Sequence, residues 1–189
     1  MREIAALLVF LLLSPGLVSG ASDDDDVYKE DAIKHHIYKP PPGSEWKEQG
    51  LVVPPYPSDD NLISIDVGQY DFRYKVFVDS ASLSVGKDRV VRYTVVLRSK
   101  SGVDNVSFEG IRCNRNQYKR YAYGTNGQFY PLPVNDWAFI RRQRQDIYRT
   151  VLYNEFFCPL PTGDAVAVIR SKLKSSGNDD RYIFSGDKE

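Results

Sequence analysis

The stretch RVVRYTVVLRSKSGVDNVSFEGIRC, residues 89–113, decides the fold of this chain. Its first half alternates, with Val91, Tyr93, Val95 and Leu97 on one side and Arg92, Thr94 and Arg98 on the other. A period of two is typical of a half-buried strand, so one face is expected in the core and the other in water. A turn is predicted at 99–102, and Val106 and Phe108 then resume the alternation. The stretch therefore predicts an antiparallel hairpin.

Further strands are predicted on both sides of this hairpin. Short apolar or alternating runs occupy residues 62–65, 74–78, 82–85, 118–123 and 128–130. Asn126 and Gly127 both tolerate a positive φ, and this dipeptide is the strongest short hairpin pattern. The middle of the chain is thus expected to form a meander of five to six antiparallel strands.

The later part of the chain changes to a helical period. Asn135 or Asp136 is expected to cap a first helix, one face of which carries Trp137, Ile140, Arg144, Ile147, Val151 and Leu152. Thr162 or Asp164 is expected to open a second helix, which carries Val166, Val168, Ile169 and Leu173 and ends near Gly177. The predicted fold class is α+β, with two helices that cover one face of the antiparallel sheet.

Four segments are expected. Residues 1–21 have the layout of a cleaved signal peptide, because an apolar run too short to span a bilayer precedes small residues. Residues 22–60 form an acidic, proline-rich extended arm, in which like charges and prolines oppose compact structure. Residues 61–176 form the domain, and 177–189 form a C-terminal tail. No membrane span is expected to remain after cleavage.

The two cysteines, Cys113 and Cys158, are expected to form a disulfide, because the chain carries an export signal. The bridge would close a loop of about 45 residues and contribute about 4 kcal/mol in the chain-entropy model. A redox pair and two separate reduced thiols remain as alternatives.

Trp46 is the one large apolar ring in an otherwise polar stretch of the arm, so it is expected to dock, either on the domain or on a partner. His35 and His36 are the only histidines in the chain. Adjacent residues of an extended segment point apart, so no metal site is expected there, and no cofactor is implied elsewhere. Without a histidine in the domain, hydrolysis by a Ser-His-Asp or Cys-His arrangement lacks its general base.

A basic cluster is the main candidate for binding, although the chain has 25 basic and 25 acidic residues and balances to zero. The candidate anion-binding residues are Arg112, Arg115, Lys119, Arg120, Arg141, Arg142, Arg144 and Arg149. The candidate aromatic contacts are Tyr118, Tyr121, Tyr123 and Trp137. Arginine presents a planar fork of donors to phosphate or carboxylate, and rings stack on sugars. An anionic envelope glycan, a lipid headgroup or an acidic protein fits this set, and nucleic acid is not expected. Ordinary solvated charges are the alternative.

One carboxylate near the basic residues raises the question of catalysis. Glu109 and Arg112 lie at the end of the hairpin and Asp136 precedes the first expected helix, so these residues are the candidates for an acid-base site of carboxylate and arginine. Structural ion pairing is the competing interpretation, and no catalytic residue is assigned.

Several short stretches, in order, resemble one family of bacterial envelope proteins. They are Trp46, Pro54-Pro55, Leu62 with Asp66, ASLSVG at 81–86, VVRYTVV at 90–96, Ser101-Gly102, EGIRC at 109–113, YKRYAYG at 118–124, Trp137 and Cys158. Together they resemble the cryptic neisserial protein-like family, from about Trp46 to Lys174. The resemblance implies export in a Gram-negative bacterium and a periplasmic location, and it supplies no catalytic residue or ligand.

We therefore expect a periplasmic, non-enzymatic binding or structural module of the cell envelope. A periplasmic enzyme with a carboxylate and arginine site, independent of histidine, is the alternative.

Overall fold

The computed structural model of the protein describes residues 45–133 and 136–177. The expected signal peptide at 1–21, residues 22–44 of the expected arm, His35 with His36, and residues 178–189 of the expected tail lie outside the described residues. Asn135, one of the two expected helix caps, lies outside them as well.

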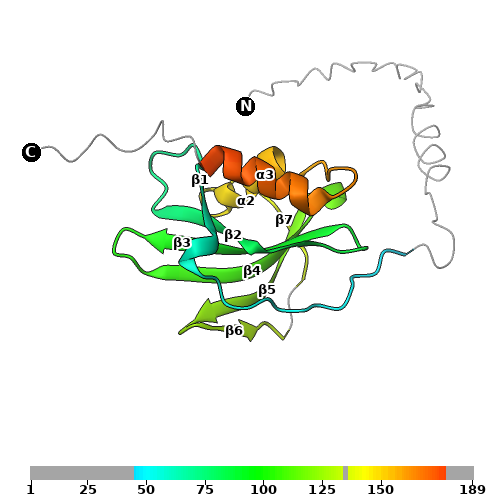
Figure 1. Ribbon diagram of the computed structural model, residues 1–189, viewed down its shortest axis with the longest axis horizontal. Helices are drawn as coiled ribbons and strands as arrows, with labels where there is room; N and C mark the ends of the chain where they lie inside the picture. The colour runs from blue at the N-terminus through cyan, green and yellow to red at the C-terminus, as the bar shows by residue number, and fades with distance from the viewer. Residues whose placement is uncertain (1–44, 134–135, 178–189) are drawn as a thin grey trace, which may run out of the picture. The chain divides into compact units, whose positions relative to one another are not determined.

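An antiparallel sheet forms the body of the protein, and six of its strands follow one another in space as they do in sequence (Figure 1). They are β1(Leu62–Ile65), β2(Tyr74–Val85), β3(Val90–Ser99), β4(Asp104–Arg112), β5(Gln117–Thr125) and β6(Gln128–Pro131). The short β7(Ala138–Phe139) pairs with the start of β5. The α+β class and the antiparallel meander are confirmed, with β7 as an addition to the five to six strands expected.

The hairpin at 126–127 forms as its dipeptide predicts. Asn126 has a φ of 51° and Gly127 a φ of 74°, so both adopt the left-handed conformation that a tight turn between β5 and β6 requires. Beside the turn, the rings of Tyr123 and Tyr130 stack with their centroids 5.4 Å apart.

The expectation of separate strands at 74–78 and 82–85 is wrong, because one strand, β2, runs through both. Its pairing with β3 shifts between Asp79 and Ser84, where a bulge interrupts the alternation. The Ser82 hydroxyl donates to the Asp79 carbonyl at 2.9 Å and accepts from the Thr94 amide at 2.8 Å. These bonds satisfy backbone groups at the irregularity.

The main core joins the sheet to the helical segments. Its buried members from the sheet include Ile65, Val76, Val78, Val91, Tyr93, Val95 and Ile111, and those from the helical segments include Tyr148, Leu152, Phe157, Ile169 and Leu173. The rings of Tyr93 and Phe157 meet edge to face, with centroids 5.0 Å apart. The apolar side expected for the first strand of the hairpin is therefore confirmed as core.

The expectation that the opposite side of β3 is wet is wrong. Arg92 is 6% exposed and Thr94 is fully buried. Residues 46–57 run beside the sheet in extended form, and in this stretch Val53 packs with Phe108 and Tyr121 (Figure 1). An irregular segment far away in sequence thus covers the second face, which strand periodicity could not reveal.

The expected first helix is replaced by a shorter, irregular helical segment. The chain forms 3-10 helix η3(Arg144–Asp146), α2(Ile147–Val151) and a π-helix, η4(Leu152–Phe157). Trp137 comes just before β7 and Ile140 just after it, so neither residue lies in a helix. The Ile140 amide instead donates to the Asn116 carbonyl, next to the start of β5, at 2.9 Å. The helical spacing of Trp137 and Ile140 was therefore a coincidence of the sequence.

The second expected helix is α3(Ala165–Gly177). The Asp164 carboxylate accepts from the Ala167 amide at 3.0 Å, so Asp164 acts as the expected cap. Ile169 and Leu173 are fully buried against the main core, whereas Val168 is largely exposed.

The disulfide between Cys113 and Cys158 is present, which confirms the expected pairing across 45 residues. It ties the end of β4 to the residue after η4. Among the helices of the described residues, none has the length and apolar character that crossing a membrane would require.

Candidate functional site

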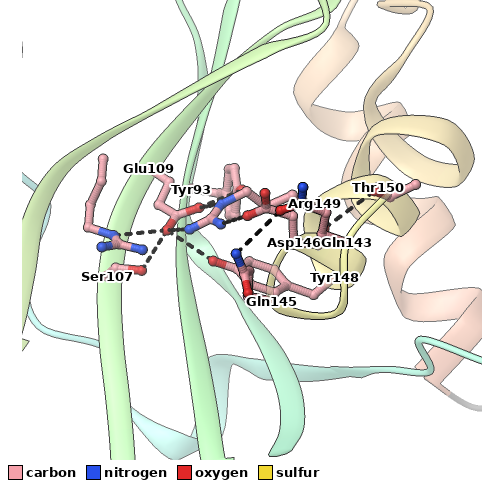
Figure 2. A network of polar contacts seen from close by, with 10 residues as sticks. Tyr93, Ser107, Glu109, Gln143, Gln145, Asp146, Tyr148, Arg149 and Thr150 are labelled. Atoms are coloured by element: carbon pink, nitrogen blue, oxygen red, sulfur yellow. Dashed lines mark hydrogen bonds and ion pairs between the residues drawn. The ribbon is translucent and has the colours of Figure 1, made fainter. Parts of the chain in front are cut away.

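A buried polar network links the sheet to α2, and Glu109 is its centre (Figure 2). The Glu109 side chain is 0% exposed and accepts hydrogen bonds from five residues. These bonds come from Tyr93 at 3.1 Å, Ser107 at 2.9 Å, Arg120 at 3.3 Å, Tyr148 at 3.1 Å and Arg149 at 2.8 and 2.6 Å. We call these residues, with Asp146, the Glu109 network.

Arg149 is the main counter-ion of Glu109. Its Nε and Nη2 atoms donate to the two carboxylate oxygens, and its Nη1 atom donates to Asp146 at 2.5 Å. The guanidinium also lies 3.9 Å from the ring centroid of Tyr118 and 4.5 Å from that of Tyr148. Arginine forms such bidentate, stacked contacts where lysine cannot.

The electrostatics of the network favour an ionised Glu109. Burial is the largest single influence and opposes the charge, but Arg149, Arg120 and Ser107 together outweigh burial and hold the pKa of Glu109 below its ordinary value. Burial and then the Glu109 charge raise the pKa of Tyr93 and of Tyr148 well above the ordinary value for tyrosine. Both phenols therefore stay protonated and act as donors.

The Glu109 network is suited to holding the fold rather than to proton transfer with a substrate. Both oxygens of Glu109 are engaged by donors, and the side chain has no contact with solvent. Breaking such a buried pair costs about 3–5 kcal/mol, although a complete apolar replacement can be neutral. Glu109 pairs with Arg149 and Arg120, and among the described contacts it pairs with neither Arg112 nor Asp136.

A second cluster lies on the opposite face, where residues 46–57 cross the sheet. Its rings are Trp46, Trp137 and Tyr121, and its cations are Arg92, Arg112 and Lys119. We call it the Trp46 cluster. Trp46 and Trp137 meet edge to face at 5.9 Å, and the Arg112 guanidinium lies 3.6 Å from the ring centroid of Trp46. Trp46 therefore docks on the protein's own domain.

Two carboxylates of the Trp46 cluster are already engaged. Glu48 accepts from Lys119 at 2.9 Å and from the Tyr121 hydroxyl at 2.7 Å. Asp88 pairs with Arg92 at 2.6 Å and also accepts from the Gln49 amide. The Trp46 indole donates to the Asp88 carbonyl at 2.8 Å. Residues 46–49 are thus held by backbone and side-chain groups of the β2–β3 turn and by side chains of β5.

The backbone of Gly110 makes room for Tyr121 in this cluster. A Cβ atom at Gly110 would lie 2.8 Å from the Tyr121 ring and 2.9 Å from Val90. A bulge between Phe108 and Glu109 shifts the β4–β5 register. The small residue at this position lets the Tyr121 hydroxyl reach Glu48.

A pocket of about 660 Å³ opens beside Arg112. Its lining includes Trp46, Arg112, Asn114, Arg115, Gln117 and Phe139. Phe139 is 60% exposed and Trp46 is 37% exposed. We call it the Arg112 pocket. It combines two guanidinium groups, exposed rings and side-chain amides, a set suited to a small anionic ligand that carries a ring.

The expected anion-binding residues divide among several environments. Arg149 and Arg120 belong to the Glu109 network, Lys119 pairs with Glu48, and Arg144 pairs with Asp71 at 2.8 Å. Arg112 and Arg115 line the Arg112 pocket. Arg141 and Arg142 are exposed in the stretch after Ile140 and have no ion pair among the described residues. Of the expected aromatic contacts, Tyr118 stacks on Arg149, Tyr121 and Trp137 join the Trp46 cluster, and Tyr123 stacks on Tyr130.

Sequence reasoning missed Tyr93, Ser107, Asp146 and Tyr148 as partners of Glu109, and Glu48 and Asp88 in the Trp46 cluster. One indication was available: once Val106 and Phe108 are given one face of β4, Glu109 falls on the other. The register places Glu109 opposite Tyr93, a residue expected in the core. The remaining partners come from segments whose approach only the tertiary fold determines.

Comparisons with known proteins give one family and one relative. A family model described as the CNP1-like family matches residues 42–174, more than half of the chain. The chain is also 28% identical to Cryptic neisserial protein 1 of Neisseria gonorrhoeae over 176 residues, which cover 82% of this chain and 84% of that protein. No solved structure matches the chain.

Proposed function

The chain belongs to the CNP1-like family, and on that premise we propose that it is an exported, periplasmic, non-enzymatic binding module of the bacterial cell envelope. In this proposal the module contacts an anionic envelope component through a basic surface. The surface is formed by Arg112, Arg115, Arg141 and Arg142. In the same proposal α2, η4 and α3 cover one face of the sheet. The binding surface lies at the end of the sheet near the β4–β5 turn, where Arg112 and Arg115 line a pocket.

The observation that carries the proposal is the set of arginines without ion-pair partners among the described residues, of which Arg112 and Arg115 line the same pocket. No ion pair to Arg112, Arg115, Arg141 or Arg142 occurs within the described part of the chain. Backbone and side-chain bonds between Asn116 and Ile140 hold the loops of Arg115 and Arg141 together. Adjacent unpaired cations raise the local positive potential, which favours an anionic partner.

The enzyme alternative receives less support from this geometry. Catalysis by a carboxylate requires an oxygen that can reach the proton it transfers. Glu109, the carboxylate with the most donors, is fully buried and shares both oxygens with protein groups. Its arrangement supports a structural role for the carboxylate and arginine pair.

Charge-removal variants test the binding surface on a column that carries a sulfated glycan. The variant Arg115→Gln/Arg141→Gln/Arg142→Gln should elute at a clearly lower salt concentration than the unmodified mature protein, because exposed charges act within about 10 Å at ordinary ionic strength. Its control, Arg73→Gln/Lys75→Gln/Lys100→Gln, removes the same charge elsewhere, at exposed positions without ion pairs among the described residues. An equal change in both variants would reject a localised surface.

The proposed location is tested separately by fractionation of the source bacterium. The protein should occur in the periplasmic fraction with its new N-terminus near residue 21 or 22, as mass spectrometry of the intact protein can measure. A cytoplasmic protein that retains residues 1–21 would contradict export.

A further inference from the structure

The guanidinium of Arg112 is held between aromatic rings but has no hydrogen-bond acceptor in the described part of the chain. Its Nε atom is buried and has no hydrogen-bond partner there. The guanidinium lies 3.6 Å from the Trp46 ring centroid and 5.6 Å from that of Trp137, so the rings fix its plane. The indole Nε1 of Trp137 is also buried without a partner among these residues. Buried donors normally find an acceptor, and of these two residues Arg112 lines the Arg112 pocket whereas Trp137 does not.

The terminal nitrogens of Arg112 are the part of the fork that a ligand can reach. Only Nε of this side chain is both buried and unpartnered. Its Nη atoms form no hydrogen bond with a described residue and are not among the buried unpartnered atoms, and Arg112 lines the Arg112 pocket. A fork held by rings loses little freedom when it binds an oxyanion, and preorganisation of this kind improves affinity.

The charges around Arg112 favour an anion with two negative charges. The carboxylates of Glu48 and Asp88 are engaged with Lys119 and Arg92. Burial, and then the nearby charge of Arg115, lower the pKa of Arg112 below its ordinary value, although the charges of Glu48 and Asp88 oppose the shift. A dianion between Arg112 and Arg115 would offset both effects, and a phosphate monoester carries close to two charges at neutral pH.

The remaining lining of the pocket suits a sugar. The exposed parts of Phe139 and Trp46 provide apolar surface for a ring. Asn114 and Gln117 provide amide donors and acceptors for hydroxyl groups. The Arg112 pocket is an open hollow whose volume of about 660 Å³ lies within the usual range for small-ligand sites.

We propose that the Arg112 pocket binds a phosphate monoester carried on a sugar, with Arg112 and Arg115 on the phosphate and Phe139 and Trp46 against the sugar ring. This inference rests on the proposed function, since it names the anionic group that the basic surface recognises. The same chemistry occurs on soluble sugar phosphates and on phosphorylated lipid headgroups.

The first experiment measures binding of four probes to the mature protein by titration calorimetry. Glucose 6-phosphate should bind more tightly than inorganic phosphate, which lacks the ring, and than glucuronate, which carries a single carboxylate. Glucose should bind most weakly. If inorganic phosphate or glucuronate binds as tightly as glucose 6-phosphate, the assignment of a sugar phosphate is overturned.

The second experiment changes the residues of the pocket. Arg112→Gln should weaken glucose 6-phosphate binding by about tenfold or more, the usual effect of losing a charge-assisted hydrogen bond. Arg112→Lys should restore only part of the affinity, because an ammonium lacks the fork. Unchanged affinity in Arg112→Gln would overturn the proposal.

Arg112 also contributes to the Trp46 cluster, so a second variant guards against a change in folding. Arg115 is exposed and has no ion pair among the described residues, so Arg115→Gln should keep the melting temperature while weakening glucose 6-phosphate binding. The matched control is Lys100→Gln, which removes an exposed charge in the β3–β4 turn. If Arg115→Gln and Lys100→Gln bind the probe equally well, the role of Arg115 is rejected.

Vesicles separate the two sources of the phosphate. Tighter sedimentation with vesicles that contain a phosphorylated glycolipid than with vesicles that contain phosphatidic acid, which lacks the sugar, lost in Arg112→Gln, would assign the headgroup as the source. Binding to glucose 6-phosphate alone would assign the soluble sugar phosphate. A protein that the sulfated-glycan column retains but that binds none of the phosphate probes would refute this inference and leave the proposed function standing. A protein that the column does not retain would refute the proposed function itself.

Discussion

At the scale of single residues, Glu109 and Arg149 have the largest consequences. Their contact joins a strand of the sheet to α2 inside the protein, where water cannot solvate either charge. Because each ion lost its hydration on folding, the pair as a whole contributes little net stability, whereas removal of one partner leaves a buried charge uncompensated. The effect of a substitution at Glu109 or Arg149 on the free energy of unfolding therefore depends mainly on the burial of the remaining charge.

Removing Arg149 should be strongly destabilising. Arg149→Met removes the main counter-ion of Glu109 and the ion-pair partner of Asp146, although Arg120 remains beside Glu109, and we expect the free energy of unfolding to fall by about 3–5 kcal/mol in urea. Arg142→Met, an equivalent change at an exposed position, should alter it by less than about 0.5 kcal/mol. The double variant Glu109→Gln/Arg149→Met should recover part of the loss. Additive losses from the two single changes would contradict direct coupling.

The pH dependence of stability should report the ionisation of Glu109. Its folded pKa lies below the ordinary value of 4.5, so its stabilising contribution is present above 4.5 and is lost as the pH falls toward the folded pKa. The melting temperature of the unmodified protein should therefore fall more steeply below pH 4.5 than that of Glu109→Gln. Some slope should remain in the variant, because the pKa of Asp88 is also lowered.

The control for this measurement is Glu155→Gln, at an exposed carboxylate, which should keep the slope of the unmodified protein. If Glu109→Gln and Glu155→Gln follow the same acid profile, Glu109 is not the group that titrates.

At the scale of elements, residues 46–57 behave as part of the domain although they contain no strand or helix. Trp46, Glu48 and Gln49 each form a hydrogen bond or ion pair with residues of the sheet or its turns. Val53 and Tyr56 contribute apolar contacts, and the Tyr56 and Phe129 rings lie 5.5 Å apart. This segment gives β3 and β4 a covered second face.

Loss of the Trp46 ring should loosen this segment. Trp46→Ala should lower the free energy of unfolding by roughly 2 kcal/mol, less than for a fully buried tryptophan because the side chain is 37% exposed. Trp46→Phe keeps a ring against Arg112 but loses the indole bond to Asp88, so a loss of about 1 kcal/mol is expected. Chemical denaturation measures both, and equal losses would show that the ring contributes nothing beyond its hydrogen bond.

The disulfide should stabilise the connection between β4 and η4. Cys113→Ser/Cys158→Ser should lower the free energy of unfolding by about 4 kcal/mol in the chain-entropy model, since 45 residues separate the cysteines. A reductant should produce a similar loss in the unmodified protein and none in the variant. A reductant effect that persists in the variant would have a cause other than this bridge.

The elements also differ in how well the sequence predicts them. The strands and α3 could be predicted, because period-two alternation, the Asn126-Gly127 dipeptide and the Asp164 cap are local patterns. The first helix was mispredicted because Trp137 and Ile140 have helical spacing. The two residues between them form β7, which pairs with β5. The buried side of Arg92 could not be foreseen, since its cover comes from residues far earlier in the chain. The Glu109 network draws its partners from 2 to 40 residues away, beyond any local pattern.

At the scale of the whole molecule, β3 and β4 are the most enclosed part. Each has a strand on both sides, and every residue from Val90 to Val96 and from Val106 to Ile111 is buried. The main core with the Glu109 network lies on one face, and the Trp46 cluster with residues 46–57 lies on the other. The Arg112 pocket thus lies at the end of β4, one of the two most enclosed strands.

Hydrogen exchange should follow this enclosure. Backbone amides of β3 and β4 should exchange most slowly, because their opening requires global unfolding, whereas amides of β6 and β7 should exchange faster at the edge of the sheet. Mass spectrometry of deuterated peptides from 90–112 and 128–139 measures the difference. Equal exchange of the two regions would contradict the enclosed position of β3 and β4.

The covering by residues 46–57 also decides where a shortened version of this protein can start. A fragment that begins just before β1 would keep every described strand but would lose the residues that cover Phe108 and Phe129. The apolar surface exposed in this way would favour aggregation. A fragment designed to fold independently should therefore begin no later than Trp46, although residues 46–61 contribute no strand to the sheet.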